Sequence, residues 1–278
     1  MLKKELVSVI ITTKNEGAVL RRLLRSIKDQ LHKNIEIIVV DNNSIDNTKK
    51  IALEFTRSVY NFGPERSAQR NHGAKKSKGK YLIFLDADME LTKNVVKDCM
   101  CLMNSDKKMG GAVIPEKSIA RSYWEKVKAF EREFYNEHGD PITDAARFFK
   151  KNVFVSVGGY DEKITGPEDW DFPETVKKAG FRIGRISSQI LHHERISSPI
   201  NLAKKKYYYA LCSPRYLKKH SIPIWGPKTV YFLRPVFYKN MNKFIEHPTL
   251  FLGMSIMLTL ELLGGGLGYL MGRVKRVE

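Results

Sequence analysis

The stretch YLIFLDADM, residues 81–89, runs five large apolar residues directly into two acids that one small residue separates. A short, wholly apolar run predicts a strand buried on both faces, as in a parallel sheet. In open α/β sheets, ligands bind at the carboxyl ends of such strands. The carboxylates of Asp86 and Asp88 at that end suit Mg²⁺ or Mn²⁺, which in turn holds phosphate. An isolated D-x-D is more often a solvated acidic turn, so the rest of the chain decides between the two interpretations.

Strand-like and helix-like segments alternate along the chain. Residues 6–13 are a β-branched run, residues 18–31 carry apolar residues at helical spacing, and residues 35–40 form a second apolar run. This order is the βαβ rhythm of a parallel sheet. Further helices are expected over 48–55, 65–76, 91–104 and 119–137, and short strands near 58–60, 112–114, 181–183 and 189–191. We therefore predict an α/β fold, a mostly parallel central sheet flanked by helices.

Composition limits the classes of function. At 278 residues the chain can bury a full core. Its net charge of +18 implies an anionic partner, which is nucleic acid, an anionic membrane surface or a phosphorylated substrate. Three cysteines, without metal-ligand spacing, fit a reduced cytosolic environment. Because the N-terminus runs directly into strand-like sequence, we expect no signal peptide and a cytosolic catalytic part.

Polar clusters follow three of the predicted strands, at residues 12–16, 41–46 and 86–88. In a parallel sheet all three lie along one edge and can build one site. Asp41 can accept a hydrogen bond from a base N–H or a ribose hydroxyl, and Arg70 can reach a base or a phosphate. The ordinary alternatives are that Asp41 forms a turn and that Arg70 is a surface charge.

Six motifs occur in a telling order: TTKNE at 12–16, VDNNSIDNT at 40–48, QRNHG at 69–73, FLDAD at 84–88, GGYD at 158–161 and GPED at 166–169. Each is weak alone, but together they resemble the family 2 glycosyltransferases over roughly residues 5–195. The resemblance implies a GT-A (Rossmann-like) fold, a nucleotide-sugar donor, a divalent metal and inversion at the anomeric carbon.

The resemblance implies a set of donor-binding residues. Thr12, Glu16 and Asp41 match the nucleoside-binding positions, and Arg70 matches the arginine of the family's A-R-N element. Asp86 matches the acid near the ribose, so we expect it to contact the donor's sugar or a metal-bound water.

The metal ligands follow by the same carry-over. Asp88 matches the acid that ligates the metal, here Mn²⁺ or Mg²⁺. His192 matches a histidine that completes the metal site after the last core strand, and His193 remains open in its place.

The catalytic residues are expected in the GPED motif. Asp169 matches the general base, because the acceptor hydroxyl loses a proton as it attacks. Glu168 is expected to position the acceptor or the loop, and Trp170 to stack on a sugar face. The ordinary alternative is that the acids Glu168, Asp169 and Asp171 only favour the positive N-terminus of a helix.

The end of the chain differs in character. We divide the chain into a catalytic domain over 1–198 and a basic, aromatic helical region over 199–278. A nucleotide-binding half of about 1–110 and an acceptor-binding half of about 111–198 make up the former. The apolar segment 249–272 contains Glu261 as its single charge. Its length allows one membrane span, but this acid and a glycine cluster at 264–268 favour monotopic or peripheral attachment. Flanking basic residues favour the cytoplasmic leaflet.

The sequence as a whole predicts an inverting, metal-dependent glycosyltransferase at the cytoplasmic face of the cell membrane. Its expected partners are a nucleotide-sugar donor, a saccharide or polyprenyl-linked acceptor and an anionic membrane surface, and not nucleic acid. We expect such an activity to serve polysaccharide or glycolipid biosynthesis. One alternative is a nucleotidyltransferase that makes a nucleotide sugar, although no glycine-rich phosphate loop follows the first strand. The other is a non-catalytic protein that binds anionic lipid or nucleic acid through charge alone.

Overall fold

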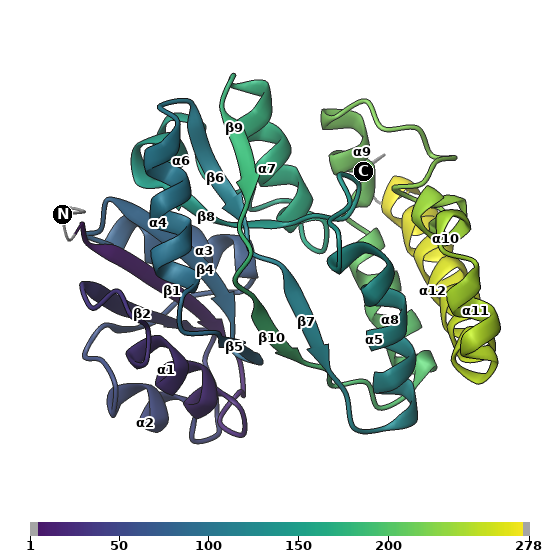
Figure 1. The fold of residues 1–278 in the computed structure, drawn as a ribbon, viewed down its shortest axis with the longest axis horizontal. Coiled ribbons are helices and arrows are strands. Elements are labelled where there is room, and N and C mark those ends of the chain that lie inside the picture. Colours follow the sequence, from purple (N-terminus) through teal and green to yellow (C-terminus); the bar gives the residue numbers. More distant parts are fainter. Residues whose placement is uncertain (1–4, 275–278) are drawn as a thin grey trace. The chain divides into compact units, whose positions relative to one another are not determined.

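The structure, a computed structural model, describes residues 5–274, and within them a seven-stranded sheet is the centre of the first of two compact units (Figure 1). In spatial order its strands are β3 (Val59–Asn61), β2 (Ile35–Asp41), β1 (Val7–Thr13), β4 (Tyr81–Asp86), β8 (Ala146–Lys150), β6 (Met109–Val113) and β9 (Arg182–Arg185). Neighbours pair in parallel except at β8, which runs antiparallel to β4 and to β6. The predicted α/β fold is confirmed.

Helices cover both faces of this sheet. The first face carries α1 (Leu20–Lys28), α2 (Thr48–Leu53) and α4 (Val95–Ser105), and the second carries α3 (Arg66–Lys76), α6 (Lys151–Ser156) and the later part of α7 (Glu168–Lys178). Side chains of β4 alternate between the two cores, with Ile83 in one and Phe84 in the other. The wholly apolar run therefore does mark a strand buried on both faces, at the middle of the sheet.

A second, smaller sheet was not predicted from the sequence. It joins β5 (Met89–Leu91), β10 (Ile190–His193) and β7 (Glu116–Ile119) in that order. A strand was expected near residues 189–191, where β10 lies, but β5 and β7 were not expected. Strands of three or four residues are too short for alternation to show, so their long-range pairing defines them. The expected helix over 119–137 is accordingly shorter, because residues 116–119 form β7 and α5 (Tyr123–Asn136) begins after it.

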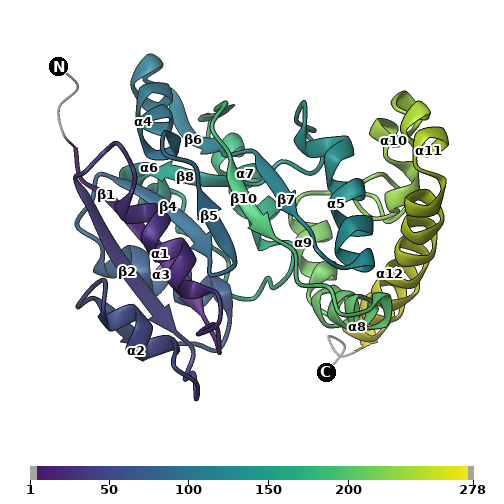
Figure 2. The ribbon, with the colours of Figure 1, turned by 60° about the horizontal axis from the view of Figure 1, so that its bottom comes forward.

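The second unit comprises residues 117–144, 163–171 and 193–278. Besides α5, its helices are α8 (Pro199–Ala210), α9 (Ser213–Lys219), α10 (Pro235–Lys239), α11 (Asn242–Glu246) and α12 (Pro248–Val274), with a 3₁₀ turn at Tyr231–Leu233. Figure 2 shows α12 lying along α8. The apolar core of this unit draws on α5, α10 and α12, through side chains such as Phe130, Phe237 and Met257.

Glycines let α12 approach α8 closely. Gly264, Gly268 and Gly272 recur every four residues on one face of α12. A Cβ at any of them would collide with a backbone carbonyl of α8 or of the residue that follows it. The glycine cluster therefore serves helix packing within the second unit.

A buried charge cluster fixes α12 to both α8 and α5. Glu261 of α12 pairs with Lys128 of α5 (3.1 Å) and with Lys206 of α8 (3.2 Å), and Lys128 also pairs with Glu131 (2.5 Å). Burial alone would raise the pKa of Glu261, but the two lysines outweigh it and hold this pKa at about 2. The single acid of the apolar segment is thus a structural ion-pair partner.

We expect Glu261→Gln to lower the free energy of unfolding by about 3 kcal/mol, because it removes the carboxylate that the buried Lys128 and the partly buried Lys206 share. Urea denaturation measures the change. The matched control is Glu246→Gln at an exposed site on α11, which should shift stability by no more than about 0.5 kcal/mol. Equal effects of the two substitutions would contradict a stabilising role for the cluster.

The same carboxylate predicts a pH dependence. Its pKa is lower in the folded protein, about 2, than its ordinary value of 4.5. Its contribution to stability is therefore fully present above pH 4.5 and is lost as the pH falls toward 2. Denaturation midpoints measured across this window should fall more steeply for the native chain than for Glu261→Gln. Parallel curves would show that Glu261 does not titrate in this way.

Candidate active site

The carboxyl ends of β1, β2 and β4 form one polar edge of the main sheet. Thr13 lies in register with Asp41 across β1 and β2, and Thr12 lies in register with Asp86 across β1 and β4. The hydroxyl of Thr13 donates to Asp41 Oδ1 over 2.8 Å. The three strand ends therefore meet at one edge, as the sequence predicted.

Asp41 closes the loop that follows β2. Its side chain is fully buried. Besides Thr13, it accepts hydrogen bonds from the backbone N–H of Ser44 (2.8 Å) and from the Ser44 hydroxyl (2.5 Å). Its turn-forming role is thus observed, and its contact with a nucleoside stays a prediction.

Glu16 lies in the loop after β1, and that loop is fastened to the loop after β2. Its backbone N–H donates to the Thr48 hydroxyl over 2.8 Å, and the N–H of Gly17 donates to Asp46 over 3.0 Å. The half-buried side chain of Glu16 is therefore carried on a braced loop at the polar edge.

Arg70 is fully buried in α3, so its alternative interpretation as a surface charge is wrong. Its guanidinium donates to Asp86 Oδ1 over 3.2 Å and lies 5.2 Å from the centre of the Tyr160 ring. Asn71 holds Tyr160 through two 2.9 Å hydrogen bonds, one to its carbonyl and one from its N–H. Gly159 has a φ of +70°, and a Cβ there would press on Asn71. The QRNHG and GGYD motifs thus form one support for Arg70.

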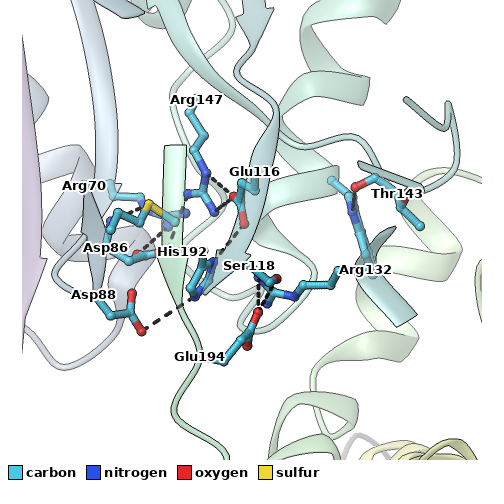
Figure 3. A network of polar contacts seen from close by, with 12 residues as sticks. Arg70, Asp86, Asp88, Glu116, Ser118, Arg132, Thr143, Arg147, His192 and Glu194 are labelled. Carbon is cyan, nitrogen blue, oxygen red and sulfur yellow. Dashed lines mark hydrogen bonds and ion pairs between the residues drawn. The ribbon is translucent and has the colours of Figure 1, made fainter. Parts of the chain in front are cut away.

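Asp86 is shared between two guanidinium groups (Figure 3). Besides Arg70, Arg147 lies 3.4 Å from Asp86 Oδ2. Burial alone would raise the pKa of Asp86, but the charges of Arg70 and Arg147 outweigh it and hold the pKa below its ordinary value. Asp86 is therefore a carboxylate, able to accept hydrogen bonds and not to donate them.

A chain of polar contacts leads from Asp88 through His192 to Glu116 (Figure 3). His192 Nε2 lies 3.7 Å from Asp88 Oδ2, and His192 Nδ1 lies 2.8 Å from Glu116 Oε2. Burial acts to raise the pKa of Asp88, but its interaction with His192 lowers it overall. Because side chains alternate along a strand, His193 points to the other face of β10. The structure thus brings His192, and not His193, to Asp88.

The donor atoms of Asp88 and His192 suit Mn²⁺, which accepts carboxylate oxygen and imidazole nitrogen. Within residues 5–274 no group of three or more His, Cys, Asp or Glu side chains is arranged to hold a metal alone. Cations that serve phosphate substrates take one or two protein carboxylates and complete their shell with phosphate and water. The two residues therefore fit a cation bound jointly with a diphosphate.

Glu116 and Arg147 were missed by the sequence analysis. Arg147 stands near the start of β8, and since β8 is antiparallel to β4, its start lies at the carboxyl end of β4. Glu116 begins a strand that was not predicted. The one sequence signal was a charged residue beside each of two apolar runs, which is too common to identify a site.

The GPED motif opens α7, and its acids lie in the first helical turn. Glu168 is buried and Asp169 is half-buried. Asp171 is buried and pairs with Lys219 and with His220 Nε2, each over 2.8 Å. The indole N–H of Trp170 donates to the carbonyl of Thr143 over 3.0 Å. The roles expected for Glu168, Asp169 and Trp170 stay predictions.

A protein-family model matches the N-terminal part of the chain. The model for glycosyl transferase family 2 matches residues 8–159, more than half of the chain. The chain is also similar to the GalNAc(5)-diNAcBac-PP-undecaprenol beta-1,3-glucosyltransferase of Campylobacter jejuni, with 33% identity over 253 residues that cover 86% of this chain and 74% of that protein. The chain covers 62% to 87% of the length of three relatives, which are the Campylobacter enzyme and two uncharacterized glycosyltransferases.

Solved structures share the fold at low sequence identity. S. aureus TarS 1–349 in complex with UDP-GlcNAc has a TM-score of 0.55 and 16% identity, covering 98% of this chain and 92% of that chain. The mannosyltransferase PcManGT from Pyrobaculum calidifontis, in complex with GDP-Man and Mn²⁺, has a TM-score of 0.58 and 13% identity, covering 99% and 79%. These similarities show the fold.

Proposed function

Because the chain belongs to glycosyl transferase family 2, we propose that it transfers a sugar from a nucleotide-sugar donor to a hydroxyl acceptor, with inversion at the anomeric carbon. The observation that carries the proposal is the acid pair at the end of β4. Asp86 is held ionised between two arginines, and Asp88 faces an imidazole nitrogen. That UDP-GlcNAc and GDP-Man occupy two proteins of this fold supports the donor class.

The donor binds along the polar edge of the main sheet. Thr12, Glu16 and Asp41 contact the nucleoside, where a carboxylate accepts from base N–H groups and ribose hydroxyls. Asp86 faces the ribose or the transferred sugar, and Arg70 keeps its carboxylate oriented. Asp41 and Asp86 are both held by hydrogen bonds within the protein before the donor binds. Donor binding therefore has to order few side chains.

Asp88 and His192 hold the divalent cation, Mn²⁺ or Mg²⁺. When bound, the cation offsets the negative charge that develops on the departing diphosphate. The supporting observation is the donor set itself, one carboxylate oxygen and one imidazole nitrogen that face each other over 3.7 Å.

Asp169 accepts the proton of the acceptor hydroxyl. The acceptor oxygen forms a bond to the anomeric carbon while the bond from that carbon to the phosphate oxygen breaks, and the proton passes to the Asp169 carboxylate. Glu168, buried beside it in the same helical turn, positions the acceptor or the loop, and Trp170 presents its ring to a sugar face.

We expect Asp169→Asn to lower kcat by about 10²–10⁴-fold, because an amide cannot take the proton. Asp88→Asn should abolish Mn²⁺-dependent turnover. Donors are first chosen by screening nucleotide sugars with Mn²⁺ for thermal stabilisation of the protein, and turnover is then measured as release of nucleoside diphosphate.

The control for both variants is Asp106→Asn, in the loop before β6, which should retain full activity. Release of pyrophosphate would instead indicate a nucleotidyltransferase. Unchanged function in both site variants would indicate a protein that only binds anionic ligands.

For the acceptor we propose a lipid-linked saccharide at the cytoplasmic face of the cell membrane. The Campylobacter relative is named for an undecaprenol-linked saccharide acceptor. In addition, α12 is long and apolar enough to cross a membrane. Its outer side carries an apolar ridge of exposed side chains, which comprises Leu252, Ile256, Leu263, Leu267, Leu270 and Val274.

The opposite side of α12 decides how this helix meets the membrane. Glu261 is buried in ion pairs with lysines of α5 and α8, and the glycines of α12 pack on α8. Because one side of α12 packs against its own unit, only the other side can contact lipid. We therefore propose that the apolar ridge lies in the membrane interface without crossing it, and that exposed basic residues such as Lys239 and Arg273 meet anionic headgroups.

We expect the double variant Leu263→Glu/Leu267→Glu to lose flotation with vesicles that contain anionic lipid, because it places two charges on the apolar ridge. Turnover of a soluble acceptor should persist. The matched control is Leu31→Glu/Leu53→Glu, at two similarly exposed leucines of the first unit. If the ridge variant still floats, the proposed lipid contact is wrong. It is also wrong if the native chain forms a stable dimer through α12, because the partner chain and not lipid would then cover the ridge.

A further inference from the structure

We propose that Glu116 is a positioning residue of the cation site: its carboxylate fixes the orientation and the tautomer of His192, so that Nε2 is the nitrogen presented to the cation. The inference rests on the proposed cation site and assigns to it a residue that does not itself bind the metal.

The first support is the hydrogen bond between Glu116 and His192. Glu116 Oε2 lies 2.8 Å from His192 Nδ1, whereas Nε2 faces Asp88 over 3.7 Å. An ionised carboxylate only accepts, so Nδ1 carries the hydrogen and the neutral ring keeps its lone pair on Nε2. A carboxylate behind a metal-ligating histidine sets ring orientation and ligand basicity in this way.

The second support is that Glu116 is itself fixed. Arg147 contacts Glu116 Oε1 through Nη2 (2.8 Å) and Nε (2.9 Å), which leaves Oε2 for the histidine. The Arg147 side chain is only 6% exposed and that of Glu116 16%. Two oxygens with separate partners cannot rotate without breaking both contacts, so the carboxylate is locked.

The third support is the course of the small second sheet. Glu116 begins β7, His192 lies on β10, and Asp88 immediately precedes β5, with β10 between β5 and β7. His192 pairs in register with Met89. The sheet thus holds the imidazole between one carboxylate on either side, and Figure 3 shows the resulting line of contacts.

Arg147 gives this arrangement a wider consequence. Its Nη1 lies 3.4 Å from Asp86, the acid assigned to the donor's sugar. One guanidinium therefore orients both the donor-facing carboxylate and, through Glu116, the cation-facing imidazole. The Arg147 guanidinium thus orients side chains in both halves of the proposed donor site.

The test is the affinity for Mn²⁺ in the presence of UDP or GDP, measured from the electron paramagnetic resonance signal of free Mn²⁺. We expect Glu116→Gln to weaken binding by about 10–100-fold. The matched control is Glu194→Gln, one residue past the end of β10, where the carboxylate pairs with Ser118 and Arg132. That variant should bind Mn²⁺ within about twofold of the native chain.

A second readout follows the ring itself. Nitrogen-15 NMR of the metal-free protein, at a pH at which the His192 ring is neutral, should show the Nδ1–H tautomer in the native chain. In Glu116→Gln a mixture is expected, because an amide both donates and accepts. If Glu116→Gln does not fold, Glu116→Asp keeps the charge but shortens the side chain, and the same loss of Mn²⁺ affinity is expected.

Two outcomes distinguish failure of the positioning role from failure of the cation site. If Glu116→Gln and Glu116→Asp bind Mn²⁺ like the native chain while Asp88→Asn does not, the positioning role is overturned and the cation site stands. If Asp88→Asn and His192→Ala also bind like the native chain, the cation site itself is overturned.

Discussion

The charge balance around Asp86 is the interaction on which the first unit's site depends. Arg70 is fully buried, and a buried guanidinium requires a compensating carboxylate, so the end of β4 and the helix α3 must meet. Arg147 brings the start of β8 to the same carboxylate. The Tyr160 ring, which Asn71 holds in place, also contacts Arg70. Residues far apart in the chain are thus fixed around one ionised acid before any ligand arrives.

The second unit uses the same principle for a different purpose. Glu261 joins α5, α8 and α12 through the buried Lys128 and the partly buried Lys206, and the glycines of α12 allow close packing against α8. An apolar segment with a central acid is a poor membrane span. It is a good structural helix, because one side satisfies its charge within the protein while the opposite side keeps its leucines exposed.

Each unit carries different residues of the proposed transfer reaction. The first carries the acids and arginines proposed to bind the nucleotide, and also Asp88 and His192, the proposed ligands of the cation. The second carries the first turn of α7 with Asp169, and the helix with the apolar ridge. In that unit Asp171 is buried against Lys219 and His220 of the C-terminal region. The C-terminal helices therefore also support the turn that bears the proposed base.

The sequence by itself determined the parallel strands β1, β2 and β4 of the sheet and the meeting of their polar ends at one edge, because long apolar runs and their order are local properties of the chain. It also ordered the six motifs that resemble the family. It did not predict β8, the antiparallel strand beside β4. Only the tertiary structure showed the second sheet, placed His192 and not His193 near Asp88, and brought Glu116 and Arg147 beside them. Those contacts join short strands and single charged residues across 31 to 76 positions of sequence. Such residues have no periodic pattern, so their partners are decided by how the strands pair.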